Sequence, residues 1–285
     1  MIMDTFNIYF FKERSRQIDL DSLLNFFQNY EETEVEMDER SVRFKYQHPR
    51  LNYGACFYIT PKSMVPNIYN LNPKYLEINF HIEIPILTPN YVIKQIIDFV
   101  KKVTERFDLF VYSELFSDVL PFKSDTVYKA YTIVKKAYLE KFPDKASQYI
   151  FVSTEKLSAI LRYLDEQMQL QAYYKDLDTY VPRYLYFKEN NRPVLCIEWT
   201  EGKLTVFPPY LDYVMYRTAG KLKVVEYDQF TQDNQKFLMD VPGFLKGTRV
   251  VPKKFAKKLY GYMKKQPLSS IGQSFNQLRL EELLD

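Results

Sequence analysis

One stretch of ten residues, YLEINFHIEI at positions 75–84, alternates without a break between apolar and polar side chains. A period of two with one fully apolar face is typical of a β-strand that is buried on one side. Thr88 and Pro89 then form a favoured helix start, because the N–H that proline lacks would have no partner at the first helical position. We therefore expect residues 75–84 to be the central strand of an α+β domain.

The segments around this strand complete one domain. A strand at residues 6–11 and a helix that begins near Asp19 precede a hairpin at residues 33–46. A further strand leads to the central one, and an amphipathic helix and a short strand follow it. The resulting order is β-α-β-β-β-β-α-β. This order predicts a ferredoxin-like α/β sandwich with additional strands, which covers residues 1–122.

The rest of the chain changes its hydrophobic period twice. Residues 123–180 have the period of helices, with a break at Pro143, and we interpret them as a helical connector. From residue 181 the period returns to two, which predicts strands at 184–188, 194–199, 203–207, 213–217 and 222–227. Because short turns separate these strands, we expect residues 181–285 to form an antiparallel β-meander with terminal helices.

Glycine is scarce, with 7 in 285 residues, and this excludes several classes of enzyme. Loops that hold a phosphate need glycine where the backbone approaches the ligand, and the chain has no G-x-G-x-x-G or G-x-x-x-x-G-K motif. It also lacks the G-x-S-x-G motif of many hydrolases. Cys56 and Cys196 have neither the number nor the spacing of a disulfide framework or a zinc site. We therefore expect no cofactor and no metal ion.

The cysteines and the apolar segments also indicate where such a chain works. Both cysteines lie in apolar, strand-like runs, which favours reduced core residues and a cytoplasmic setting. The N-terminal segment carries Asp4 and has no basic region, so it is a poor signal peptide. The longest apolar runs are far shorter than the roughly 18 residues of a membrane span. We therefore expect no membrane partner.

The polar face of residues 75–84 gathers acids, an amide and one of the two histidines in the chain. Side chains two residues apart on a strand lie roughly 6.5–7 Å apart on one face. His81 could therefore share a proton relay with Glu77 or Glu83, and these three residues are candidate catalytic groups. The alternative is a face that is simply in contact with water, as one face of an antiparallel sheet commonly is.

A basic segment lies at residues 241–265 and contains no aspartate or glutamate. Its cations are Lys246, Arg249, Lys253, Lys254, Lys257, Lys258, Lys264 and Lys265. Pro252 can start a helix with an apolar stripe, on which lysines would present a basic face to phosphates or to an acidic protein. Lysine is a point charge rather than a base reader, so any nucleic-acid contact would be to the backbone. The alternative is a surface helix whose lysines are merely solvated.

The C-terminal tail after Pro267 carries apolar residues at helical spacing, and we interpret it as a short helix. Its candidate contact residues are Phe275, Leu278 and Leu283. A helix this short has too few contacts to be stable alone. It therefore docks either on its own chain or into the groove of a partner.

Three functions are compatible with these features. Missing cofactor motifs, scarce histidine and a body with 17% aromatic residues favour a non-enzymatic adaptor that binds a protein partner through its surface. The first alternative is a protein that binds the phosphate backbone of nucleic acid through residues 241–265. The second alternative is an enzyme with its site on the polar face of residues 75–84.

Overall fold

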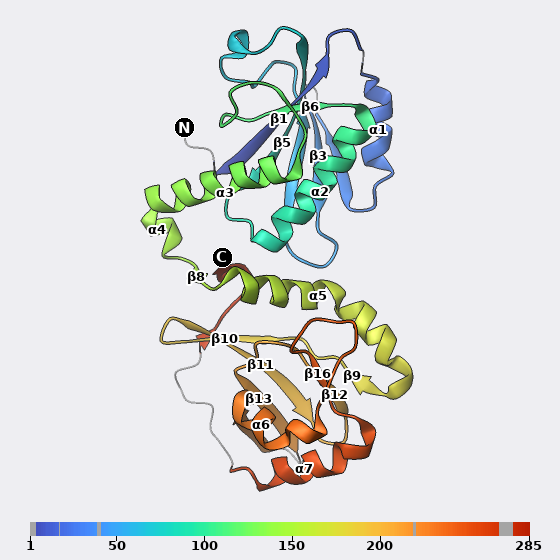
Figure 1. The fold of residues 1–285 in the computed structure, drawn as a ribbon, viewed down its shortest axis with the longest axis vertical. Coiled ribbons are helices and arrows are strands. Elements are labelled where there is room, and N and C mark those ends of the chain that lie inside the picture. The colour runs from blue at the N-terminus through green and yellow to red at the C-terminus, as the bar shows by residue number, and fades with distance from the viewer. Residues whose placement is uncertain (1–3, 17, 39–40, 219–220, 268–275) are drawn as a thin grey trace. The chain divides into compact units, whose positions relative to one another are not determined.

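The structure is a computed structural model that describes residues 4–16, 18–38, 41–218, 221–267 and 276–285. Helices and sheets both contribute to it, which confirms the α+β class (Figure 1). The chain divides into two compact units, Met1–Ser147 and Gln148–Asp285. This division differs from the three segments expected from the sequence, because the helices of residues 123–180 are shared between the two units.

Seven strands form one antiparallel sheet in the first unit. They are β1 (Thr5–Glu13), β2 (Thr33–Met37), β3 (Val42–Gln47), β4 (Gly54–Ile59), β5 (Tyr75–Pro85), β6 (Phe110–Tyr112) and β7 (Leu120–Pro121). Their order in the sheet is β2-β3-β4-β5-β1-β6-β7, and each neighbouring pair is antiparallel. The central four strands, β4-β5-β1-β6, have the order of a ferredoxin-like sandwich. The β2–β3 hairpin and β7 extend the sheet at its two edges.

Helices cover one face of this sheet, and aromatic rings fill the space between. The helices described in this unit are α1 (Leu20–Gln28), the short 3-10 helix η1 (Ile68–Asn70), α2 (Asn90–Phe107), α3 (Ser124–Lys141) and α4 (Pro143–Ala146). The ring of Phe27 on α1 stacks on Phe44 with centroids 4.3 Å apart, and that of Phe99 on α2 stacks on Tyr46 at 4.8 Å. Aromatic pairs of this kind stabilise a core beyond the area that they bury.

Tyr131 explains why α3 belongs to the first unit rather than to a connector. Its side chain is fully buried. The hydroxyl lies 2.6 Å from the Ile86 carbonyl oxygen and 2.8 Å from that of Thr88, and it accepts a hydrogen bond from the Thr88 N–H. These contacts hold α3 to the loop between β5 and α2.

Strand β5 keeps the predicted alternation in its second half and loses it in the first. Phe80, Ile82 and Ile84 are buried beneath the helices as expected. Asn79 has a φ of 52°, and the pairing of β1 with β5 shifts register beside it. Such a bulge bends the strand, and Leu76, beyond it, is 49% exposed.

The second unit contains two main sheets. The five-stranded sheet has the order β14-β13-β11-β10-β17, and the four-stranded sheet has the order β15-β16-β12-β9. A short parallel pair, β18-β8, completes the unit. The strands are β8 (Ile150–Phe151), β9 (Thr179–Tyr180), β10 (Leu185–Glu189), β11 (Arg192–Thr200), β12 (Leu204–Phe207), β13 (Tyr213–Thr218), β14 (Lys221–Glu226), β15 (Met239–Asp240), β16 (Arg249–Val250), β17 (Asn276–Gln277) and β18 (Leu283–Leu284).

The predicted antiparallel meander of residues 181–285 is wrong, because β11 and β13 pair in parallel and β12 leaves for the other sheet. Asp212, just before β13, provides the physical reason. Its Oδ2 accepts a 2.7 Å hydrogen bond from the Leu195 N–H, and its own N–H donates to the Leu195 carbonyl. Pro208 and Pro209 precede it and have no N–H for a strand ladder, so the chain crosses to the far side of β11.

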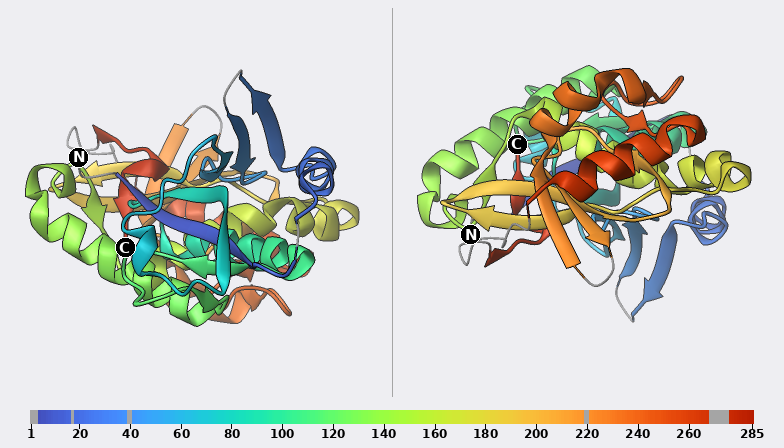
Figure 2. Two further views of the ribbon diagram at one scale, coloured as in Figure 1. Left: turned by 90° about the horizontal axis from the view of Figure 1, so that it is seen from above. Right: turned by 90° about the horizontal axis from the view of Figure 1, so that it is seen from below.

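Trp199 on β11 is the centre of the second core. It is fully buried, and the rings of Phe207, Tyr216 and Phe230 lie around it at centroid distances of 5.0–6.0 Å. Helix α7 lies at the outside of this unit, nearest the viewer in the right-hand view of Figure 2. The helices of this unit are α5 (Thr154–Tyr174), η2 (Lys175–Leu177), α6 (Tyr227–Asn234), η3 (Gln235–Phe237), η4 (Lys253–Phe255), α7 (Ala256–Lys265) and η5 (Leu280–Glu282).

Candidate binding surfaces

The candidate catalytic residues of β5 lie on the sheet face opposite the helices. His81 and Glu83 alternate with the buried Ile82, and Glu77, beyond the bulge, pairs with Phe11, on the same face as the Tyr9 that pairs with His81. His81 Nε2 lies 3.6 Å from Glu83 Oε1, so these two groups are brought together. Glu77 is not part of that pair, because its carboxylate accepts hydrogen bonds from the Ser63 side chain and the Met64 backbone.

Burial decides what this cluster can do. The His81 side chain is 5% exposed, and desolvation lowers its pKa to about 4, so the imidazole is uncharged at neutral pH. Desolvation also raises the pKa of Glu83 above its ordinary value. In the part of the chain that the structure describes, no group of acids, cysteines and histidines is arranged to hold a metal ion. The ring of His81 is therefore packed and uncharged at neutral pH, and the catalytic role of Glu77, His81 and Glu83 stays a prediction.

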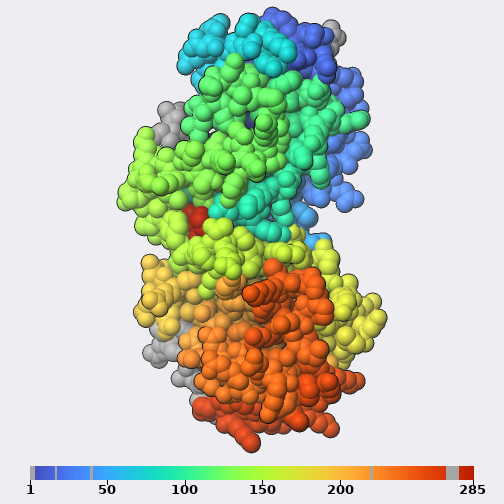
Figure 3. All heavy atoms as spheres, in the orientation of Figure 1, coloured from blue at the N-terminus to red at the C-terminus, as the bar shows by residue number. Residues whose placement is uncertain are grey.

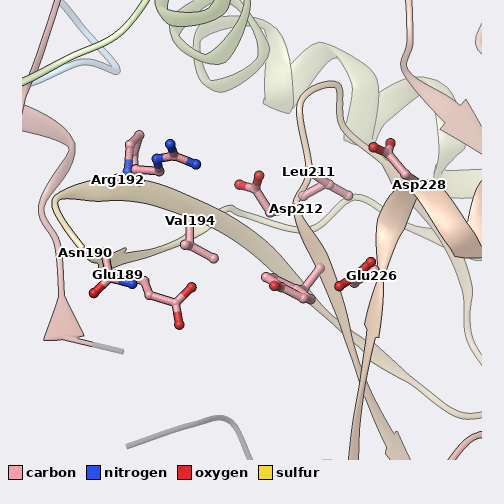
Figure 4. Close-up of a pocket in the computed structure, with 10 residues that line it drawn as sticks. Glu189, Asn190, Arg192, Val194, Leu211, Asp212, Glu226 and Asp228 are labelled. Carbon is pink, nitrogen blue, oxygen red and sulfur yellow. The ribbon is translucent and has the colours of Figure 1, made fainter. Parts of the chain in front are cut away.

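A cavity of about 590 Å³ lies in the second unit beside β11 and β13 (Figure 4). The carboxylates of Glu189, Asp212, Glu226 and Asp228 line it together with Arg192. Asp212 already accepts a hydrogen bond from the Leu195 N–H, and burial raises the pKa of the Asp212 carboxyl. The cavity is therefore an acidic depression lined by four carboxylates, one of which, Asp212, is hydrogen-bonded to the backbone of β11.

The basic segment folds as the sequence predicts around α7. Leu259 and Met263 are fully buried and form its apolar stripe. Six of the eight cations are exposed and form no ion pair with any described carboxylate: Lys246, Lys253, Lys254, Lys257, Lys258 and Lys265. The other two are paired, Arg249 with Asp240 at 3.8 Å and Lys264 with Glu201 at 2.6 Å.

Phenylalanine rings lie beneath some of these lysines. The rings of Phe237 and Phe255 are 5.4 Å apart. Lys254 Nζ lies 4.8 Å from the centroid of Phe255, and Lys258 Nζ lies 5.2 Å from that of Phe237. Lys236, which lies outside the predicted segment, approaches Phe237 in the same way at 5.1 Å. We call the set Lys236, Lys253, Lys254, Lys257 and Lys258 the basic surface.

A groove of about 430 Å³ at the C-terminal end of α5 was not predicted from the sequence. Its walls come from four separate segments, and it is lined by Tyr173, Tyr174, Asp176, Leu177, Asp178, Thr179, Leu204, Met239, Asp240, Pro242, Val250, Val251, Pro252 and Lys253. We call it the apolar groove. The yellow atoms near residues 173–180 and the orange atoms near residues 239–253 adjoin at the surface in Figure 3.

Three large apolar side chains of the groove face the solvent. Tyr173 is 65% exposed, Leu177 59% and Met239 52%. The sequence pointed to part of this groove, because Tyr173 is a large apolar residue that lies outside the buried stripe of α5. The contribution of Met239 had no such signal, because β15 is distant in the sequence and only the fold brings it to Leu177.

Of the predicted C-terminal helix, the described residues form only the three-residue 3-10 helix η5, between the short strands β17 and β18, and Phe275 lies outside them. Leu278 and Leu283 are 3% and 1% exposed and are buried in their own unit. The Leu278 N–H donates to the Tyr186 carbonyl, and β18 pairs with β8. The tail extends because these backbone pairs satisfy more groups than a short isolated helix would. Of the two alternatives expected from the sequence, the described part of the tail docks on its own chain.

Comparisons with known proteins assign no role to these surfaces. No protein-family model, no curated protein and no solved structure matches this chain. Within the described residues, no helix has the length and apolar character to cross a membrane.

Proposed function

We propose that this protein is a non-enzymatic adaptor that binds a protein partner through the apolar groove of its second unit. The observation that carries the proposal is the exposure of Tyr173, Leu177 and Met239 around one depression. Soluble proteins rarely leave several large apolar side chains together in water, and such patches mark interaction sites.

The energetics of association favour this assignment. Removing one such side chain from water contributes about 1.5–3 kcal/mol when it becomes fully buried. A tyrosine at the edge of an apolar depression is also the kind of residue that carries much of the energy of an interface. Tyr173, Leu177 and Met239 are already partly buried, so the three anchors supply part of the binding energy and the contacts of the partner around the groove supply the rest.

The free thiols support a cytoplasmic setting for the adaptor. Cys56 and Cys196 are both free thiols and form no disulfide bond. Burial raises the pKa of both, that of Cys196 to about 12, so neither is a reactive thiolate at neutral pH. Such cysteines persist where the environment keeps thiols reduced.

Site-specific crosslinking tests the adaptor. A photoreactive amino acid replaces Leu177 in one version of the protein and Met168 in another. Met168 is also on the surface, at 64% exposure, but does not line the groove. We expect irradiation in cells to join a discrete partner to the first version and not to the second. Equal crosslinking from both positions, or none from position 177, would refute the groove as the docking site.

The basic surface favours a second candidate function, the binding of a nucleic-acid backbone. Lys253, Lys254 and Lys257 are exposed and pair with no described carboxylate, so no internal ion pair has to break before they contact phosphates. The rings of Phe237 and Phe255 support this surface from beneath, because Lys258 and Lys254 lie over them.

Fluorescence anisotropy with a labelled oligonucleotide tests this second function. Binding should weaken by roughly two orders of magnitude between about 50 mM and about 200 mM salt if four or so lysines contact phosphates. Changing Lys253, Lys254, Lys257 and Lys258 to Glu should abolish it. The matched control changes four exposed lysines of the first unit to Glu: Lys94, Lys101, Lys129 and Lys136. If both quadruple variants lose binding equally, the contact reflects net charge and the assignment to this surface fails.

A further inference from the structure

We propose that the segment that enters the apolar groove has an apolar anchor residue flanked by lysine or arginine. This inference rests on the proposed adaptor function and specifies the chemistry of its partner. It follows from the placement of charge around the groove, which is acidic beside both exposed apolar walls.

The first wall is Leu177 with an aspartate on each side of it. Asp176 and Asp178 are both exposed and both line the groove. Neither forms an ion pair with a described cation. Asp178 has a φ of 48°, the left-handed conformation that ends η2, and aspartate tolerates this conformation better than most residues. The turn therefore presents Leu177 between two carboxylates.

The second wall repeats the pattern. Met239 is exposed, and the next residue, Asp240, has a side chain that is 84% exposed. The nearest cation to Asp240 is Arg249, whose Nε lies 3.8 Å from Oδ1, a loose contact between exposed groups. An apolar anchor seated between Leu177 and Met239 thus has carboxylates on both sides.

The remaining charge in the groove is a single cation, Lys253. Three aspartates against one lysine make the rim net negative, although the neighbouring surface of α7 is basic. A partner with glutamate next to its anchor would therefore meet like charges, and one with lysine or arginine would meet opposite ones. Charges at the edge of an interface select partners in this way more than they add affinity.

Three fluorescent peptides of equal length test the inference. In the first, leucine alternates with lysine; in the second, leucine alternates with glutamate; in the third, serine alternates with lysine. We expect the first to bind roughly tenfold more tightly than the second, because each of three exposed charge contacts contributes a factor of about two. We expect the third not to bind, because it has no apolar anchor.

Variants assign the binding to the groove. Changing Asp176 and Asp178 to Asn should bring the two leucine peptides close to equal affinity while both still bind. Leu177→Ser should weaken both. Met168→Ser, a matched change of an exposed apolar residue on α5 outside the groove, should leave both unchanged.

Each contrary result has a defined meaning. Equal binding of the lysine and glutamate peptides by the unchanged protein would overturn this inference and leave the adaptor function standing. Equal binding of the serine and leucine peptides would show that charge alone attracts them, and would also overturn it. Self-association that Leu177→Ser abolishes in sedimentation experiments would identify the occupant as a second copy of the chain. Failure of every leucine peptide, together with no crosslink from position 177, would overturn the adaptor function itself.

Discussion

The ring of His81 stacks on that of Tyr58 on the neighbouring strand β4, with centroids 5.2 Å apart and planes 17° apart. Together with Tyr9 on the other side, at 5.7 Å, this contact removes the imidazole from water. It also makes a direct measurement possible, because the chain has two histidines and His48 is the other.

We predict that one of the two histidine ring signals in a proton NMR titration moves with a midpoint near pH 4. The signal belongs to His81, because desolvation lowers its pKa to about 4. His81→Phe should remove that signal and leave the other unchanged. The absence of any histidine signal with a midpoint near pH 4 would contradict the burial described for this ring.

The same pKa predicts how stability depends on pH. Between about pH 6.5 and pH 4 the unfolded chain binds a proton at His81 that the folded chain does not, so the first unit loses stability as the pH falls. The loss is at most about 3 kcal/mol. The raised pKa values of Glu77 and Glu83 act in the opposite direction, since their folded carboxyls keep protons longer as the pH rises. Comparing wild type with His81→Phe over this range isolates the histidine, and parallel curves would contradict the prediction.

Tyr131→Phe should destabilise the first unit by about 0.5–1.5 kcal/mol, because it removes the buried hydroxyl that lies 2.6 Å from the Ile86 carbonyl oxygen, while the Thr88 N–H keeps the Pro85 carbonyl as an acceptor. Denaturant unfolding followed by circular dichroism measures the change. Tyr69→Phe is the control, since Tyr69 is 96% exposed and should change stability by less than about 0.5 kcal/mol. Equal effects of the two substitutions would mean that Tyr131 does not hold α3 in place.

The contrast between β5 and α3 shows what local sequence can and cannot predict. The second half of β5 and the start of α2 depend on side chains a few residues apart, so periodicity finds them. The place of α3 depends on a hydroxyl that reaches Ile86, 45 residues away in sequence, and no pattern within α3 carries that information. The parallel pairing of β11 with β13 likewise begins at two hydrogen bonds between Asp212 and Leu195, which lie 17 positions apart in the sequence.

The candidate surfaces divide in the same way. The basic surface was found in large part because its lysines are close together in the sequence, and Lys236 was missed because it is not. The apolar groove was missed because Leu177 and Met239 are 62 positions apart, and each alone resembles an ordinary surface residue. For the polar face of β5 the sequence left open a catalytic cluster or a face in contact with water, and it did not reveal that Val65 and Val119 form an apolar cluster with Tyr9 on that side of the sheet.

Lys223→Met should destabilise the second unit by roughly 1.5–3 kcal/mol, the range for hydrogen bonds to a charged group. Lys223 is 9% exposed, and its ammonium donates to the carbonyls of Lys264 and Gln266, where α7 ends. Lys221→Met on the same strand is the control, since Lys221 is exposed. Should the control unfold as easily as Lys223→Met in denaturant, the ammonium does not stabilise the end of α7.

Leu284→Ala should cost the second unit about 2–5 kcal/mol, as other buried leucines do when truncated. Leu284 is fully buried, and its carbonyl accepts a hydrogen bond from the Val152 N–H. Glu281→Ala, an exposed position in the same tail, should change little. Thermal and denaturant unfolding distinguish the two, and a stable Leu284→Ala protein would show that the tail is dispensable.

The chain has one tryptophan, and it stands at the centre of the second core. Its indole N–H donates to the Lys203 carbonyl, so its surroundings change when that core opens. Selective excitation of the indole therefore follows the second unit alone, while the first unit contributes tyrosine emission. Trp199 is therefore a natural fluorescent probe of the second unit. A single titration with denaturant, followed by tryptophan and tyrosine fluorescence, can establish whether the two units unfold together or in succession.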